Sequence, residues 1–358
     1  MVEQRLINRM PCGLGVESRG HERYRSEMNS GSARRSALHI RRAVPKDRQR
    51  VLELCALSLG WDPDGPNADF FAWKHDHNPF GVSPAWLAES EPGDLVGVRV
   101  LLRWEFRGPL GEVIKMVRAV DTATHPDWQG QGIFTKLTLG ALDDVQGEGV
   151  RGVFNTPNDQ SRPGYLKMGW VPVARVPVAM RPRSIQSLPR VLQARTSASK
   201  WSERCEVGCG IEEALESFPV GNELISSATG PGISTNYSAE YLRWRYSFGP
   251  LHYRAMLVGR NGEDGMVVFR VRRRGAALEA TICEAFVRDA RQLALATKSI
   301  LRETKADYAL VSSTLAGARS LMLKTPRLGP MLVWRDLNGQ PVPMIDELRL
   351  SLGDIELF

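Results

Sequence analysis

The stretch from Asp121 to Phe134 combines hydroxyl, amide and carboxylate side chains with closely spaced glycines. It reads DTATHPDWQGQGIF, and it follows a run of β-type residues and precedes a run with helical spacing. A strand, a Gly-rich turn and a helix start together present several backbone N–H groups in one concavity, with the positive end of the helix dipole behind them. Such a site suits a phosphate group.

Three residues of this turn have types that fit a phosphate site. Gly130 and Gly132 allow the main chain to approach a ligand closely, and Gln129 can donate from its side-chain amide. A tight surface turn is the alternative interpretation. The chain has no Gly-Lys-Ser/Thr triphosphate loop, and no complete G-x-G-x-x-G with an acidic residue at the required distance.

A second segment, NDQSRPGYLKMGW, spans residues 158–170 and places Tyr165 seven positions after Asn158. With both segments present, the chain resembles the GNAT acyltransferase superfamily, whose motif A reads roughly P-x-x-Q/R-x-x-G-x-G/A and whose motif B ends N…Y-x-x-x-G-F. The resemblance covers about residues 38–183. The matching residues are Pro126, Gln129 and Gly132 for motif A, and Asn158, Tyr165, Gly169 and Trp170 for motif B.

The resemblance implies an acyl-CoA co-substrate, most simply acetyl-CoA. We expect no metal, because His75 and His77 would need a third ligand and a helix would turn them to different faces. It places Thr122, Ala123 and Thr124 beside the acyl group, and the pyrophosphate on Gln129, Gly130, Gln131, Gly132, Ile133 and Phe134, with Asn158 also in contact with CoA. Phe134 departs from the small residue that ends motif A, and it can crowd the turn or reshape the groove. For Asn158, a helix cap is an equally acceptable interpretation.

Acyl transfer to an amine needs a polarised thioester carbonyl, a neutral amine and a proton for the departing thiolate. Backbone N–H groups near Ala123 can polarise the carbonyl, and the phenol of Tyr165 can donate the proton. The alternative for Tyr165 is a core tyrosine bonded to a carbonyl. Asp121 is the candidate general base, because burial in a strand can raise the pKa of a carboxyl group; a hydrogen bond to the turn, or a water chain in place of the base, is the alternative.

Composition indicates a globular chain without a membrane span. Of 358 residues, 42% are hydrophobic and 24% charged, and no apolar run approaches the roughly 18 residues of a spanning helix. Residues 1–50 hold 12 Lys and Arg against 5 Asp and Glu, so 12 − 5 = +7 equals the whole net charge. We interpret residues 1–36 as a disordered basic leader rather than a nucleic-acid arm or a signal peptide, and leave open a start at Met28.

Five scattered cysteines fit a reducing compartment better than a disulfide framework, so we expect a cytoplasmic protein. The strand-like runs 86–89, 95–106 and 115–124, separated by turn signals, predict an antiparallel meander. We predict an α/β (α+β) fold with two GNAT-like domains, each a mixed, largely antiparallel twisted sheet flanked by helices. The predicted limits are 37–183 for the catalytic domain, 184–204 for a linker, and 205–358 for a degenerate domain.

The second half of the sequence resembles a degenerate duplicate of the first half. A shift of 171 positions sets DFFAWKHDHNP over EYLRWRYSFGP, with Trp73 over Trp244, and sets LVGVRVLLR over MVVFRVRRR. No Q-x-x-G-x-G follows the corresponding strand of the second half, so we expect CoA only in the first.

The sequence leaves three functions open. The first is an acyl-CoA-dependent N-acyltransferase that transfers the acyl group directly to a small-molecule or peptide amine. The second is a Fem-type aminoacyltransferase, which uses aminoacyl-tRNA and needs no intact CoA turn. The third is a non-catalytic acyl-CoA-binding protein. We expect no membrane or nucleic-acid partner for the first; its acceptor and the oligomeric state are not specified by the sequence.

Overall fold

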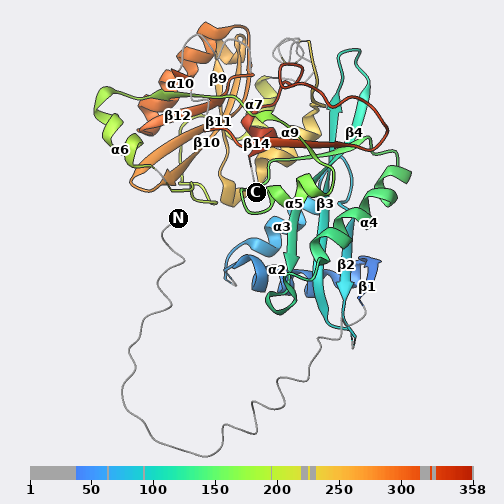
Figure 1. Ribbon diagram of the computed structural model, residues 1–358. Coiled ribbons are helices and arrows are strands. Elements are labelled where there is room, and N and C mark those ends of the chain that lie inside the picture. The colour runs from blue at the N-terminus through green and yellow to red at the C-terminus, as the bar shows by residue number, and fades with distance from the viewer. Residues whose placement is uncertain are drawn as a thin grey trace, which may run out of the picture. The chain divides into compact units, whose positions relative to one another are not determined.

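The chain is built on two mixed β-sheets with helices packed against them (Figure 1). The computed structural model describes residues 38–356 except 63, 92, 195, 219–224, 226–230, 315–322 and 325–327. The predicted leader, residues 1–36, lies outside the described residues.

The first sheet holds the predicted meander. All neighbouring pairs in it are antiparallel except β4 with β5, and β8 (Ser234–Thr235) adds to β3 outside the main order. The order is β1 (His39–Arg42), β2 (Ala85–Glu89), β3 (Leu95–Arg107), β4 (Val113–Thr124), β5 (Gly152–Asn155), β14 (Met331–Asp336) and β6 (Val171–Arg175).

The second sheet repeats this pattern of directions. Its pairs are antiparallel except β11 with β12, which correspond to β4 and β5. The order is β13 (Leu323–Lys324), β7 (Val178–Pro182), β12 (Tyr308–Ser312), β11 (Ala277–Val287), β10 (Gly265–Arg274) and β9 (Arg254–Val258). The predicted fold class, two mixed and largely antiparallel sheets with flanking helices, is confirmed.

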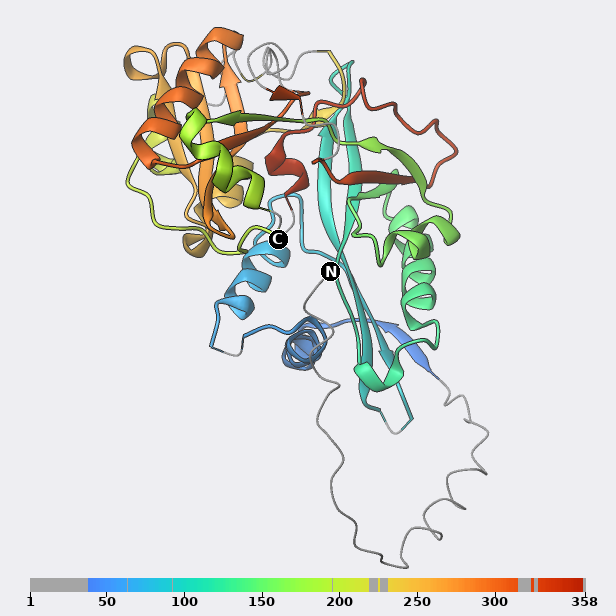
Figure 2. The same cartoon turned by 60° about the vertical axis from the view of Figure 1, so that its left-hand side comes forward.

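The helices of the first half cover both faces of its sheet. Figure 2 shows α4 on one side of the strands, with α2 and α3 on the other. The α-helices are α2 (Arg48–Leu59), α3 (Asn67–His75), α4 (Ile133–Gly147), α5 (Arg162–Lys167), α6 (Leu188–Gln193), α7 (Ile211–Ser217), α9 (Ala239–Ser247), α10 (Ala290–Thr304) and α12 (Leu352–Ile355), and the 3₁₀ turns are η1 (Pro45–Asp47), η2 (Pro126–Trp128), η3 (Ile185–Ser187), η4 (Gly249–Leu251) and η5 (Arg260–Gly262). Helix α4 presents its apolar side to β2, β3 and β4, as the spacing of its buried residues predicts.

Each sheet receives a strand from the other half of the sequence. Strand β7 lies N-terminal to the predicted linker, yet it pairs with β12 of the second sheet. Strand β14 lies far to the C-terminal side, yet it separates β5 from β6 in the first sheet. Backbone hydrogen bonding therefore crosses the predicted limits at 183 and 205 in both directions, and α6 lies inside the predicted linker.

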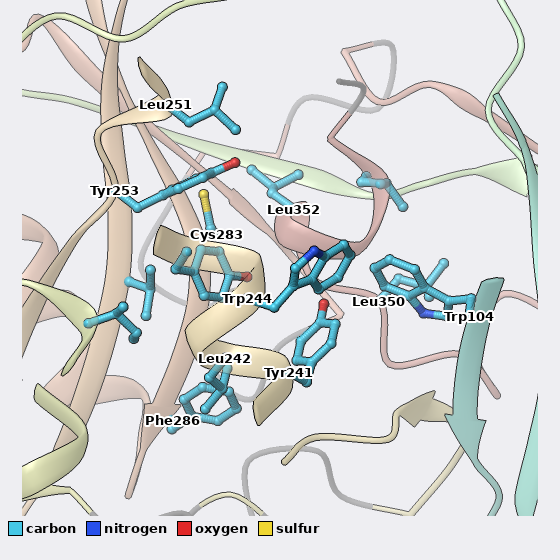
Figure 3. Packing of buried hydrophobic residues seen from close by; sticks show 14 of the residues in the cluster. Trp104, Tyr241, Leu242, Trp244, Leu251, Tyr253, Cys283, Phe286, Leu350 and Leu352 are labelled. Carbon is cyan, nitrogen blue, oxygen red and sulfur yellow. The ribbon is translucent and has the colours of Figure 1, made fainter. Parts of the chain in front are cut away.

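One hydrophobic cluster contains residues of both sheets. Trp104 of β3 packs edge-on against Tyr241 of α9, with ring centroids 5.7 Å apart (Figure 3). Trp73 and Trp244 stack with centroids 5.3 Å apart, and each indole N–H donates to the other residue's backbone carbonyl at 2.7 Å. The two halves thus share a core, which is how two sheets bury their apolar faces.

Among the described residues, every helix is too short or too polar to cross a lipid bilayer.

Candidate active site

Strands β4 and β5 separate beyond a short paired region. Only Met116–Arg118 of β4 pairs with β5, whereas β4 continues to Thr124. On the edge that faces β5, the part of β4 from Ala119 onward therefore borders a gap rather than a neighbouring strand. This gap opens at the carboxyl ends of two parallel strands, where ligands bind in many α/β sheets.

The gap contains a cavity of about 630 Å³. Its wall brings together almost all of the residues predicted from the sequence: Asp121, Thr122, Ala123, Thr124, Gln129, Gly130, Gly132, Ile133, Phe134, Asn158 and Tyr165. The exception is Gln131, which is exposed and lies outside the cavity wall.

The Gly-rich turn has the geometry that a phosphate cradle needs. Gly130 and Gly132 both have φ of +76°, in the left-handed region that favours glycine, and Gly132 is the N-cap of α4. A Cβ atom added at either residue would meet no atom within 4 Å, so the space beside the turn is open. The first N–H groups of a helix have no intrahelical acceptor, and α4 directs them at this open space.

A β-bulge in β4 faces the cavity. The register shifts between the pairs Val98–Ala123 and Val100–Val120, so that Asp121 and Thr122 together oppose the single residue Arg99. Asp121 has φ of +41°, a strained conformation for a residue with a side chain. The bulge turns both side chains toward the cavity.

Arg99 connects the bulge to Tyr165. Its side chain is fully buried, and it donates one hydrogen bond to Thr122 Oγ1 and another, of 2.9 Å, to Tyr165 Oη. Because the phenol oxygen accepts from Arg99, the Tyr165 hydroxyl hydrogen can be donated to another group. Tyr165 is 4% exposed and lines the cavity, so its hydroxyl group lies in the cavity wall.

Phe134 packs on this pair rather than blocking the turn. Its ring meets the Tyr165 ring edge-on at 5.4 Å between centroids, and the Arg99 guanidinium lies 5.1 Å from its centroid. The residue that departs from motif A therefore forms one side of the cavity and helps to enclose Arg99.

Asp121 does not have the raised pKa that the sequence suggested. Its burial does raise the pKa, but the ammonium of Lys74 and the hydrogen bond from His75 outweigh this effect and lower the pKa below its ordinary value. Lys74 Nζ contacts Oδ2 of Asp121, and His75 Nε2 lies 2.7 Å from the same oxygen. A carboxylate held in this way is a weak base, so the predicted raised pKa of Asp121 is wrong.

His75 is a partner of Asp121 on helix α3. Its burial lowers the pKa to about 4, although the hydrogen bond to Asp121 acts in the opposite direction. The imidazole is therefore neutral near pH 7, and Nε2–H donates to the carboxylate. Within the described parts of the chain, no three His, Cys, Asp or Glu side chains lie close enough to hold a metal ion.

Asn158 lines the cavity and also forms hydrogen bonds within its own turn, while the N-cap of α5 is Ser161. Asn158 Oδ1 accepts from both the backbone N–H and the hydroxyl of Ser161 at 2.9 Å, just before α5. Two neighbours contribute more directly to the cavity: Asn155 Oδ1 and Thr156 Oγ1 are buried, line the wall and have no hydrogen-bond partner among the described residues. Buried polar atoms of this kind normally have a partner, so they fit the amide groups of a pantetheine arm.

Sequence reasoning missed Arg99, Lys74, Asn155 and Thr156 as site residues, and it considered His75 only for metal binding. Two of these residues could have been found as charged residues in apolar stretches of the sequence. Arg99 interrupts the run LVGVRVLL, and Lys74 follows FFAW. Charged residues in such positions are rarely buried without a partner.

Comparison with known proteins agrees with this geometry. A family model described as an acetyltransferase (GNAT) domain matches residues 39–173. These residues are therefore a GNAT domain, and the resemblance seen in motifs A and B is confirmed. No curated protein matches the chain significantly.

Solved structures share the fold over most of the chain. A probable N-acyltransferase from Enterococcus faecalis V583 has a TM-score of 0.60 at 10% identity, with 87% of this chain and 74% of that one covered. GCN5-related N-acetyltransferases from Kribbella flavida (TM-score 0.58, 16% identity, 85% and 72% covered) and Anabaena variabilis (0.59, 13%, 84% and 72%) are also similar. At these identities the likeness concerns the fold, and it extends across both sheets.

Proposed function

We propose that the protein is an acyl-CoA-dependent N-acyltransferase that transfers its acyl group, most simply acetyl, to a primary amine by direct attack. The observation that carries the proposal is the single cavity wall shared by the open glycine turn, the unpartnered polar atoms of Asn155 and Thr156, and Tyr165. The GNAT domain supports acyl transfer in general. Four free cysteines among the described residues accord with the cytoplasm as its compartment.

The residues of the cavity wall have separate binding and catalytic roles in this proposal. The turn from Gln129 to Gly132 and the start of α4 would hold the pyrophosphate, while Asn155 and Thr156 would hold the pantetheine amides. The bound acyl-CoA supplies a thioester carbonyl next to the bulge in β4. Tyr165 donates its proton to the departing thiolate, and Arg99 stabilises the negative charge that the phenol oxygen then acquires.

Binding is tested by thermal unfolding with acetyl-CoA, because a ligand bound only by the folded state stabilises it by RT ln(1 + [L]/Kd), about 2.7 kcal/mol at 100 Kd. We expect Gly132→Asp to abolish this shift, since it places a negative charge and a side chain in the open space beside the turn. Gly132→Asn adds a side chain without a negative charge, and Asn tolerates positive φ. Comparison of the Asn and Asp variants therefore separates the effect of the charge from that of backbone strain. Gly140→Asp, on the exposed side of α4, is the matched control and should shift like the wild type.

Catalysis is tested by release of the CoA thiol from acetyl-CoA in the presence of primary amines. Amine-dependent thiol release is the expected result. A thermal shift without turnover of any amine would instead identify a non-catalytic acyl-CoA-binding protein, and dependence on aminoacyl-tRNA would identify the Fem-type reaction.

A further inference from the structure

A second cavity adjoins the acyl-CoA cavity at the bulge of β4. It has a volume of about 510 Å³ and lies between the α2–α3 connection and the segment at residues 200–201. Leu59, Asp121 and Thr122 line both cavities. A molecule in the second cavity therefore reaches the predicted acyl site without crossing the CoA turn, as an acceptor must.

Lys200 is a partly buried cation in this cavity. Its Nζ donates to Asn67 Oδ1 at 2.9 Å and lies over three aromatic rings, 4.4 Å from the centroid of Phe70, 4.6 Å from Trp201 and 5.6 Å from Trp61. It forms no ion pair with a carboxylate of the described residues. Burial, followed by the nearby Lys74 ammonium, lowers the pKa of Lys200 to about 8, so the unneutralised charge is present at neutral pH.

A cation that has lost part of its hydration and has no counter-ion favours a bound anion. The other charged groups of this wall do not supply that anion. Asp121 is already neutralised by Lys74, and Asp62 is exposed, with its carboxylate bonded to the backbone N–H of Asp64. An anionic group on the acceptor would fill this role.

The rest of the cavity indicates what separates the anion from the reacting amine. Trp61 and Trp201 present aromatic surface to the cavity, which suits an apolar body. Asp121 lies at the end shared with the acyl site. Since Lys74 neutralises Asp121, the amine is not held firmly in its charged form, and the neutral form that attacks a thioester is accessible.

We infer that the acceptor is an amine that also carries a carboxylate, that is, a molecule of the amino-acid class, and that Lys200 binds this carboxylate. The inference rests on the proposed N-acyltransferase function. In the reaction, the amine nitrogen bonds to the acyl carbon, the carbon–sulfur bond breaks, the amine loses a proton to water, and the thiolate receives one from Tyr165, which then regains a proton from water. Lys200 itself remains unmodified.

The test compares each of the common amino acids with its own carboxamide, using acetyl-CoA and thiol release. The two molecules of a pair differ in the anionic group, and the amine of the carboxamide is also more easily deprotonated, which works against the expected preference for the acid. We expect at least one free acid to exceed its amide by roughly 10- to 100-fold in kcat/KM, as for a hydrogen bond to a charged group. Lys200→Met should bring this ratio close to one, through a rise in KM for the acid. Lys200→Arg should restore most of the preference, and Lys298→Met, on the exposed side of α10, should leave it intact.

The possible outcomes separate the inference from the function beneath it. Turnover of amides, or of amines without a carboxylate, as fast as of the acids would overturn the inference and leave the N-acyltransferase function standing. Retention of the acid preference in Lys200→Met would remove Lys200 from the site. Acetylation of Lys200 itself, seen by mass spectrometry, would make it an acceptor rather than an anion partner. Turnover of no amine at all would overturn both proposals.

Discussion

Arg99 is surrounded by aromatic rings and hydroxyl groups instead of a carboxylate. The guanidinium lies 5.1 Å from the Phe134 ring centroid and 5.3 Å from that of Tyr165, and among the described residues it forms no ion pair. An uncompensated positive charge at this depth favours negative charge nearby. In the proposed reaction, it would therefore stabilise the Tyr165 oxygen after its proton has passed to the thiolate.

At the scale of single residues, we expect Tyr165→Phe to lower kcat by about 10² or more while the Kd for acetyl-CoA stays within a few-fold. The phenylalanine keeps the ring contacts with Phe134 and removes only the transferable proton. Steady-state kinetics and calorimetric binding of acetyl-CoA measure the two effects. Tyr308→Phe is the matched control, because it removes a buried hydroxyl bonded to Glu279 far along the chain. Equal losses of rate and affinity in Tyr165→Phe would make Tyr165 a binding residue.

The position of Tyr165 in the cavity wall was predictable because motif spacing is local, whereas its hydrogen bond with Arg99 was not. The two residues are 66 positions apart, on β3 and α5, and they meet only in the folded chain. The pKa of Asp121 was mispredicted for a similar reason. Burial was foreseen, but Lys74 and His75 come from a helix 46 and more positions away.

At the scale of elements, the two corresponding helices α4 and α10 begin differently. Helix α4 starts after Gly132 with its first N–H groups directed at open space. Helix α10 starts after Asp289, whose carboxylate accepts from the backbone N–H of Gln292 at 2.9 Å. A side-chain carboxylate satisfies the helix end that a phosphate would otherwise occupy. This difference gives a physical basis for the expectation, drawn from the missing glycine motif, that CoA binds only in the first half.

The second sheet also carries a buried acid that the C-terminal helix α12 helps to enclose. Glu284 of β11 accepts hydrogen bonds from Tyr246 at 2.6 Å, and from Tyr237 and Ser351 at 2.9 Å. Burial, and then the carboxylate of Asp354, raises the pKa of Glu284 to about 8. Glu284 is therefore protonated in the folded protein at neutral pH.

This raised pKa predicts that stability falls as pH rises. Between the ordinary pKa of 4.5 and the folded value of about 8, the folded state holds one proton that the unfolded state has lost, so the free energy of unfolding decreases with pH across this window. We expect Glu284→Gln to flatten the decrease. Urea unfolding at pH 6 and pH 9 measures it, and Glu240→Gln on the exposed side of α9 serves as the control. An unchanged pH dependence in Glu284→Gln would assign the effect to other groups.

At the scale of the whole molecule, the contact between Trp73 and Trp244 is reciprocal. Each indole donates to the other's carbonyl, and the two residues are 171 positions apart, the same offset that relates the two halves of the sequence. A contact in which residue i meets j as j meets i is the property of a two-fold interface. The pair therefore supports a duplication in which the copies pack about an approximate two-fold axis.

The offset was visible in the sequence because α3 and α9 keep their residue classes in order. The sequence did not show that β7 joins the second sheet and β14 the first. The alternation of apolar and polar residues in a strand indicates which face is buried, but not which strand lies beside it. The predicted limits at 183 and 205 follow the sequence repeat, while the hydrogen bonds of each sheet require strands from both sides of those limits. We therefore expect the two halves to unfold together.

The reciprocal contact between Trp73 and Trp244 predicts that the two residues contribute similarly to the free energy of unfolding. Trp73→Phe and Trp244→Phe each keep a stacked ring and remove one buried hydrogen bond, so each should lower the free energy of unfolding by about 1–3 kcal/mol, and by similar amounts. Because the residues touch, the double variant should deviate from the sum of the single variants. Urea unfolding followed by circular dichroism measures all three, and each should show one transition because the core is shared. Strongly unequal single effects, or two separate transitions, would contradict a symmetric interface that joins the two halves.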